Sequence, residues 1–275
     1  MIHGREWLEV AMTEAAIRPA GSLLEKGRYR VRLAQDATDL AAARAFRSQC
    51  FQTEVLDQDQ FDACSQHVLV EDRATGVVLC CFRLRLFQTG GDVEQSYSAQ
   101  FYDLSGLKGF AEPLAELGRF CLSPESRDPD ILRLAWAAVT KLVDQAGVAL
   151  LFGCSSFAGT DISQYHAAFA LLQYRHLAPE NWRPGLKSPL GRRFQQILAA
   201  DSKSTETEKV KPDLKQGLAQ LPPLLRSYLS MGGAVSDHLV IDPELKTLHV
   251  FTGLEIGAIS PARKRLLRSV AEIDA

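Results

Sequence analysis

The 275-residue chain lacks the features that mark a secreted, membrane-spanning or metal-binding protein. Its six cysteines include no C-x-x-C pair and no His/Cys cluster at zinc-ligand spacing, which indicates reduced thiols and no metal site. Residues 1–17 lack the continuous apolar core of a signal peptide, and no later apolar run approaches the roughly 20 residues that span a bilayer. We therefore expect a cytoplasmic protein, with a peripheral contact to the inner membrane as an open alternative.

The chain also lacks an excess of charge of either sign. Lysine and arginine together number 31, against 33 acidic residues, so no global field favours nucleic acid as a partner. A charged partner would need a local patch, and residues 263–268 (Arg-Lys-Arg-Leu-Leu-Arg) form a short basic amphipathic run. Such a run suits an acidic carrier protein or an anionic lipid surface, but is equally typical of a solvated tail.

Hydrophobic spacing predicts an α/β protein with a mixed central sheet flanked by helices. A half-buried strand is expected where Tyr29, Val31 and Leu33 alternate with arginines, and a capped helix after Asp36. The predicted order is a strand over 28–33, a helix over 37–50, a hairpin of 67–71 and 77–86, a strand around Glu116, a helix over 130–146, a strand over 148–152, helices over 163–174 and 221–231, and a hairpin of 239–242 and 247–254.

These elements divide the chain into one domain with extensions. Residues 1–27 are expected to form a helical extension, 28–258 the main domain, and 259–275 a basic tail. Within the domain, charge and Ser/Thr dominate residues 201–213, so we expect a flexible insertion over about 199–215.

The most informative stretch covers residues 114–128, where a buried strand carries Glu116 and Arg119, breaks at Pro124 and leads into a helix. A helix N-terminus can bind a phosphate through its unpaired N–H groups, and a carboxylate can accept the proton that an attacking amine loses. The combination suits acylation of an amine. Glu116 and Arg119 are three positions apart, which predicts opposite strand faces and no direct pairing.

Each of these side chains also has a purely structural interpretation. Glu116 fits a half-exposed strand position, and Arg127, beside the helix start, fits an exposed loop. Cys121 and Cys154 could act as nucleophiles toward a thioester, but no histidine stands near either, and small cysteines on buried strands usually fill the core. Direct attack by the amine is therefore preferred.

The order of elements resembles the GCN5-related N-acetyltransferase fold. Within it, Glu116, Arg119 and Phe120, together with residues 57–62 and 83–85, resemble the acyl-homoserine-lactone synthases. Residues 152–161 and 221–229 resemble, more narrowly, the ornithine N-acyltransferases, which are also described as hemolysin-like. The resemblance covers residues 29 to about 254.

The resemblance implies an N-acyltransferase that moves a 3-hydroxyacyl group from acyl carrier protein to the α-amine of ornithine, the first step of ornithine lipid synthesis. It implies no bound cofactor, because the donor's acyl-phosphopantetheine is a co-substrate. It implies Glu116 as general base and two binding sets: Arg119, Cys121, Ser123 and Arg127 for the donor, and Asp59, Asp62, Arg83 and Asp161 for the amine.

One departure from the acetyl-coenzyme A enzymes bears on the donor. Their Gln/Arg-x-x-Gly-x-Gly/Ala loop is replaced by residues 123–130, which contain no glycine. A glycine-rich loop lets the backbone approach the pyrophosphate of coenzyme A, which a carrier-protein phosphopantetheine lacks. Two alternatives stay open: a synthase resembling those that make acyl-homoserine lactones, and a non-catalytic hemolysin-like binding protein. The three aspartates could also be turn or helix-capping residues.

Overall fold

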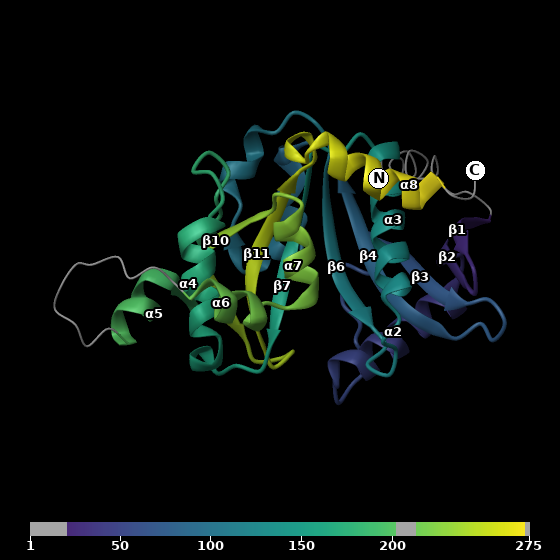
Figure 1. Cartoon of the computed structure of the whole chain (residues 1–275), viewed down its shortest axis with the longest axis horizontal. Helices are drawn as coiled ribbons and strands as arrows, with labels where there is room; N and C mark the ends of the chain where they lie inside the picture. The colour runs from purple at the N-terminus through teal and green to yellow at the C-terminus, as the bar shows by residue number, and fades with distance from the viewer. Residues whose placement is uncertain (1–20, 202–212, 273–275) are drawn as a thin grey trace, which may run out of the picture.

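A computed structural model describes residues 21–201 and 213–272 of the chain (Figure 1). The main sheet has the strand order β1-β2-β3-β4-β6-β7-β11-β10-β9, and all neighbours are antiparallel except β6 and β7. Its strands are β1 (Ser22–Lys26), β2 (Tyr29–Leu33), β3 (Gln66–Asp72), β4 (Val78–Phe87), β6 (Leu114–Leu122), β7 (Leu150–Ala158), β9 (Gly191–Arg193), β10 (Ala234–Asp242) and β11 (Thr247–Glu255).

The described residues also form seven α-helices and several short elements. The helices are α2 (Ala37–Phe51), α3 (Pro129–Gln145), α4 (His166–Arg175), α5 (Phe194–Asp201), α6 (Leu214–Gln220), α7 (Pro223–Ser230) and α8 (Pro261–Glu272). The short elements are the strand pair β5 (Tyr102–Asp103) and β8 (Gly185–Leu186) and the 3-10 turns η2 (Gly90–Gln95), η3 (Ser98–Gln100), η4 (Ser105–Gly109), η5 (Ile162–Tyr165) and η6 (Ile256–Ala258).

The two faces of the sheet carry different layers. On one, which we call the α3 face, helices α3, α4, α7 and α8 cover the sheet and lie toward the viewer in Figure 1. On the other, the α2 face, α2 and the segment 88–113 cover it. Strand alternation decides which side chain meets which layer. Ala115 and Leu117 pack with α3, whereas Leu114 and Glu116 point to the α2 face.

Most predicted elements are confirmed, because local signals specify them. Asp36 caps α2 by accepting hydrogen bonds from the N–H groups of Thr38 and Asp39. Gly147, with φ 62°, ends α3 in a conformation that a side chain disfavours.

The predicted boundaries need three corrections. Residues 22–26 of the expected helical extension form strand β1, so the sheet begins before residue 28; residues 1–20 lie outside the described part of the chain. The expected insertion starts within α5 and ends within α6, and its centre, 202–212, is also not described. Residues 261–272 of the expected tail form α8, which packs on α3 because its apolar side finds a partner there.

Candidate functional site

The parallel strands β6 and β7 separate in the middle of the sheet. Their pairing stops at Glu116 and Phe152; beyond it β6 stays paired with β4, and β7 with β11. Figure 1 shows the two strands diverging toward their C-terminal ends. Gly153 lies where they part, and a Cβ atom there would be 2.2 Å from the carbonyl oxygen of Leu117. The splay leaves backbone groups of both strands free to meet a ligand.

A β-bulge in β6 places Arg119 beside this splay. Gly118 pairs with Arg83 and Cys121 with Cys81, so Arg119 and Phe120 together oppose one residue of β4. Arg119 has φ 51°, an uncommon conformation for a residue with a side chain. The bulge turns Arg119 toward the α2 face, where Glu116 also points. The prediction that the two residues lie on opposite faces is therefore wrong, because strand alternation resets at a bulge.

Arginines and aspartates form a buried network on the α2 face. Arg83 donates hydrogen bonds to both carboxylate oxygens of Asp59, at 2.6 and 2.9 Å, and to Asp62 at 2.8 Å. Arg119 contacts Asp57 and Asp59 through bonds of 3.1 to 3.2 Å. The segment 57–62 that precedes β3 is thereby anchored to the centre of the sheet.

Arg47 completes the network from helix α2. It reaches Asp62 at 2.9 and 3.0 Å and Asp57 at 2.8 Å, while Arg44 reaches Asp62 at 2.9 Å. The sequence interpretation missed Arg47, although a signal exists: it follows Ala43 by four positions on the inner side of α2, where a buried arginine requires acidic partners.

Electrostatics holds both predicted amine-binding aspartates of this segment in their charged form. Burial alone would raise the pKa of Asp59 and Asp62, but hydrogen bonds and charges from the arginines outweigh it and lower both pKa values. The Asp62 side chain is 0% exposed and shared among three arginines, so it is a structural group rather than a direct contact for an amine. Asp59, at 21%, keeps some accessible surface.

Tyr97, also missed from the sequence, covers the two arginines that border the splay. Its ring centroid lies 4.9 Å from the guanidinium carbon of Arg119 and 5.6 Å from that of Arg83. Burial raises the pKa of Tyr97 to about 12, so its hydroxyl is neutral at pH 7. Nothing in the sequence around Tyr97 signals this position, which long-range contacts determine.

Glu116 anchors the segment that carries Tyr97. Its carboxylate accepts hydrogen bonds from the N–H of Tyr97 at 2.9 Å, the N–H of Ser98 at 2.7 Å and the Ser98 hydroxyl at 2.6 Å. The residue is 5% exposed, so it is not a half-exposed strand residue. Three donors leave about one of the four lone-pair directions of the carboxylate open.

The expected phosphate site at the start of α3 is already occupied by the chain itself. Asp128 caps the helix by accepting from the N–H of Asp130, and its other oxygen accepts the Tyr29 hydroxyl at 2.6 Å. Pro129 offers no N–H, and Asp130 adds negative charge to the first turn. This helix end is therefore a poor anion site. Arg127 is exposed and makes no hydrogen bond or ion pair within the described chain.

The cysteines are poor nucleophiles in this structure. Burial raises the pKa of the Cys154 thiol to about 12. Cys121 packs under α2, with its Sγ 3.6 Å from that of Cys81, and thiol contacts and burial raise its pKa as well. Cys121 therefore lies in the core rather than against a donor. Ser123 lies in the turn after β6, where its N–H donates a hydrogen bond to the carbonyl oxygen of Leu79.

Asp161 lies away from this network. It is exposed and caps η5, accepting hydrogen bonds from the N–H and hydroxyl of Ser163 at 3.0 and 2.7 Å. Asp161 is thus a capping residue, as the alternative interpretation of the sequence predicts, and it does not contact Asp59 or Arg83.

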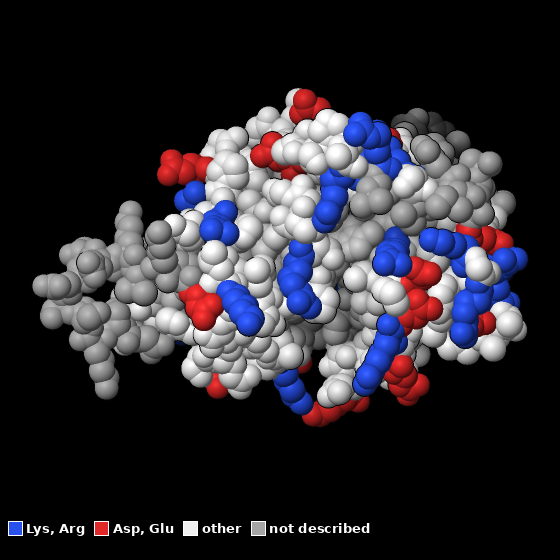
Figure 2. Space-filling model, in the orientation of Figure 1, with Lys and Arg blue, Asp and Glu red and all other residues white. Residues whose placement is uncertain are grey.

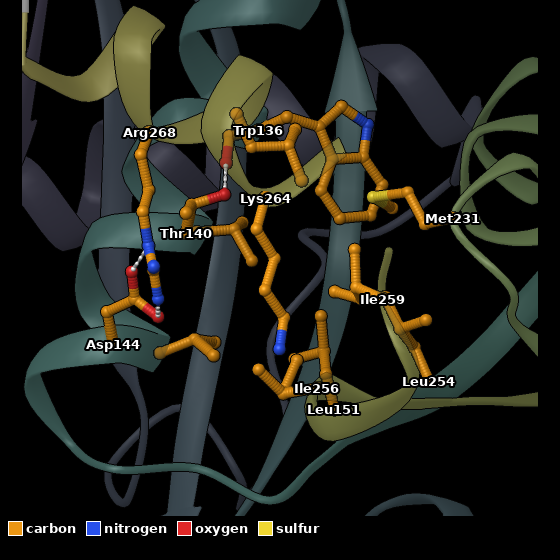
Figure 3. Close-up of a pocket in the computed structure, with 13 residues that line it drawn as sticks. Trp136, Thr140, Asp144, Leu151, Met231, Leu254, Ile256, Ile259, Lys264 and Arg268 are labelled. Carbon is orange, nitrogen blue, oxygen red and sulfur yellow. Dashed lines mark hydrogen bonds and ion pairs between the residues drawn. The ribbon is translucent and has the colours of Figure 1, made fainter. Parts of the chain in front are cut away.

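An apolar cleft lies between α3 and α8 (Figure 3). Trp136 and Leu151 line it, the Lys264 side chain lies along it, and Arg268 pairs with Asp144 at its edge. The centre of a water molecule can move through only about 30 Å³ of the cleft, which is too little for an acyl chain. The cleft therefore marks where α8 packs on the core.

Two features are absent from the described residues: a helix that could span a membrane and a cluster of metal ligands. None of the helices described is long and apolar enough to cross a bilayer. Within residues 21–201 and 213–272, no three His, Cys, Asp or Glu side chains are grouped so as to hold a metal ion.

Comparison with known proteins places the site in context. Residues 41–137 match the family model of the acetyltransferase (GNAT) domain. The chain is 28% identical to an L-ornithine Nα-acyltransferase of Rhodobacter capsulatus, over 84% of this chain and 92% of that protein. It is 27% identical to an L-ornithine Nα-acyltransferase of Rhizobium meliloti, over 90% of this chain and 87% of that protein. Among solved structures, FeeM, an N-acyl amino acid synthase from uncultured soil microbes, is 9% identical with a TM-score of 0.48, covering 84% of this chain and 94% of that one.

The matched family model covers β3, β4, the bulged strand β6 and the first half of α3, and it ends before β7. The sequence relatives extend the similarity over most of the chain. The chain is thus an acyltransferase with the fold of the GCN5-related N-acetyltransferases, similar over most of its length to the L-ornithine Nα-acyltransferases.

Proposed function

We propose that this acyltransferase moves a 3-hydroxyacyl group from acyl carrier protein to the α-amine of L-ornithine, giving lyso-ornithine lipid. The observation that carries the proposal is the splay of β6 and β7, bordered on the α2 face by Arg83, Arg119 and Tyr97. The relatives named for ornithine acylation support the choice of amine.

The acceptor is proposed to enter from the α2 face. Arg83 and Arg119 are 4% and 10% exposed, and with Arg47 and Arg44 they outnumber the three aspartates of the network. The guanidinium groups of Arg83 and Arg119, which border the splay, suit the α-carboxylate of an amino acid. Burial among aromatic rings strengthens that attraction relative to water.

The donor is proposed to approach from the α3 face. The segment 123–128 contains no glycine and α3 starts with two aspartates, a combination that does not favour the pyrophosphate of coenzyme A. Figure 2 shows lysine and arginine side chains spread over this face. Arg226 of α7 and Arg265 of α8 are exposed. Such a surface suits an acidic carrier protein.

The reaction is proposed to be a direct transfer. The amine nitrogen attacks the thioester carbon, a C–N bond forms, the C–S bond breaks, and the departing sulfur takes up the proton that the amine loses. Backbone N–H groups freed by the splay would polarise the carbonyl. Glu116 would accept the proton first, through a water in the lone-pair direction that Tyr97 and Ser98 leave open.

A reconstituted reaction tests the proposal. Purified protein, 3-hydroxyacyl carrier protein and L-ornithine should give N-acylornithine by mass spectrometry, and cells that lack the chain should lose the corresponding lipid. Absence of the product with every acyl length supplied would refute the proposed reaction.

A further inference from the structure

One buried carboxylate in the described chain lacks a matching partner. The acids less than 9% exposed are Asp57, Asp62, Glu71, Asp72, Glu116 and Asp242. The first four pair with arginines and Glu116 accepts three hydrogen bonds. Asp242 is 5% exposed and forms no ion pair with any described residue. A buried charge ordinarily needs a countercharge, so a ligand is the candidate partner.

Asp242 leaves one oxygen unused. Its Oδ1 accepts the N–H groups of Glu244 and Leu245, both at 3.0 Å, in the turn that joins β10 to β11. No described residue donates a hydrogen bond to Oδ2. The turn therefore explains the hydrogen bonds of Oδ1, whereas Oδ2 has no partner among the described residues.

Two further polar atoms without partners lie beside it. Thr247 pairs directly with Asp242 across the hairpin, and His249 follows two positions along β11, so all three side chains point to the α2 face. Thr247 Oγ1 and His249 Nε2 are buried, and neither has a hydrogen-bond partner in the described chain. Unpaired buried polar atoms are costly unless a ligand or water meets them.

The hydrogen-bond pattern assigns His249 Nε2 as an acceptor. The Tyr102 hydroxyl donates its single proton to the carbonyl oxygen of His249 at 3.0 Å, and the same hydroxyl oxygen lies 3.0 Å from Nδ1. In the tautomer that keeps both contacts as hydrogen bonds, Nδ1 carries the ring proton and donates it to that oxygen, and Nε2 is an acceptor. Burial lowers the pKa of His249 to about 4, so the ring is neutral at pH 7. The carboxylate, the hydroxyl and the imidazole therefore all offer acceptor atoms.

Aromatic contacts connect this group with the splay. The ring of Phe101 lies 4.9 Å from that of His249 and 5.3 Å from that of Tyr97, which covers Arg119. Thr247 pairs with Ala158, the last residue of β7, so the group lies at the wide end of the splay. An amino acid held by Arg83 and Arg119 could extend its side chain in this direction.

We propose that Asp242, Thr247 and His249 bind the distal ammonium of the amino acid acceptor. An ammonium has three N–H donors and a positive charge, which match three acceptors that include one unpaired carboxylate. The inference rests on the proposed function, and it transfers the ammonium contact from Asp59, Asp62 and Asp161 to residues of the C-terminal hairpin.

The test is Asp242→Asn, which keeps the oxygen that accepts the two turn N–H groups and removes the charge. Asp213→Asn is the matched control, because Asp213 accepts the N–H groups of Lys215 and Gln216 in the same spacing at an exposed helix start. The readout is the ratio of kcat/KM for ornithine to that for norvaline, which lacks the distal ammonium. We expect the ratio to fall about 10- to 100-fold in Asp242→Asn, through loss of ornithine activity, and to stay unchanged in Asp213→Asn.

A wild-type ratio in Asp242→Asn would overturn the inference and leave the proposed function intact. If the wild-type protein acylates no ornithine with any donor, the proposed function fails. The proposed ammonium site is then tested by ornithine binding alone. Calorimetric titration with L-ornithine should then show at least tenfold weaker binding to Asp242→Asn than to the wild type. Equal binding, or none to either protein, would overturn the inference.

Discussion

The guanidinium of Arg83 and the carboxylate of Asp59 meet through two parallel hydrogen bonds, Nη1 to Oδ1 at 2.6 Å and Nη2 to Oδ2 at 2.9 Å. This fork connects strand β4 to the segment before β3, and the same guanidinium reaches the fully buried Asp62. A planar guanidinium makes such contacts, whereas an ammonium cannot reproduce them. The arginine thus fixes the wall of the candidate acceptor site.

We therefore predict that Arg83→Lys lowers the free energy of unfolding by about 1–3 kcal/mol and raises the KM for the amine. Arg28→Lys is the control, because Arg28 also bonds a carboxylate, that of Asp72, but is 70% exposed, so this substitution should lower the free energy of unfolding much less than Arg83→Lys does. Urea titrations of both variants provide the measurement. If both substitutions lower the free energy of unfolding equally, the two buried hydrogen bonds between Arg83 and Asp59 contribute no more to stability than an exposed ion pair.

Glu116→Gln should lower both rate and stability. The new amide NH₂ would face a backbone N–H of Tyr97 or Ser98, which leaves a buried donor unpaired at about 1–3 kcal/mol, and loss of a base costs about 10²–10⁴-fold in kcat. Ser98→Ala separates the two effects, because it removes one donor and keeps the carboxylate. A loss of kcat in Ser98→Ala as large as that in Glu116→Gln would assign Glu116 to positioning instead of proton transfer.

Transfer without an acyl-cysteine predicts that both inner thiols are dispensable. Burial keeps the Cys154 thiol protonated, with its pKa near 12, and Cys121 is packed under α2. Cys154→Ala and Cys121→Ala should each keep kcat within about threefold, far from the loss that removal of a nucleophile causes. Intact-mass spectra of enzyme with excess donor should show no added acyl group. A stable adduct that disappears in one variant would contradict direct attack.

Stability should fall as the pH drops from about 6.5 to about 4. The pKa of His249 is lowered to about 4 by burial, with the charge of Asp242 opposing the shift and His238 adding to it, whereas the unfolded value is 6.5. In that window the unfolded chain binds more protons, so acid favours unfolding by roughly 3 kcal/mol, at about 1.36 kcal/mol per unit. His249→Gln should flatten this dependence when Tm is measured against pH. An unchanged slope would mean that another group controls it.

The donor can be tested with one acyl chain on two carriers. We predict a higher kcat/KM for the acyl carrier protein thioester than for the coenzyme A thioester, because Asp128 and Asp130 occupy the helix start where a pyrophosphate would bind. Added salt should weaken use of the carrier protein more, since its contacts are electrostatic. Equal or better use of coenzyme A at low salt would refute the preference.

The order of most strands and helices can be predicted from the sequence alone, because the signals for these elements are local. The alternation around Tyr29, the cap at Asp36 and the stop at Gly147 each act within a few residues, and the structure contains the corresponding elements. The family resemblance added the acyltransferase fold, which the comparisons confirm. Residues 22–26 of the predicted helical extension form β1, and residues 261–272 of the predicted basic tail form α8, because both elements depend on partners far along the chain.

Which charged side chains have partners depends on contacts between distant segments, and the sequence does not show these contacts. Sequence spacing cannot show that Asp62 is shared among three arginines from α2 and β4, or that a bulge turns Arg119 toward Tyr97. Nor does the turn context of Asp242 reveal that one oxygen of its carboxylate accepts no hydrogen bond from the described residues. The availability of a charge depends on every neighbour within a few ångströms, and those neighbours come from segments that the chain brings together only when it folds.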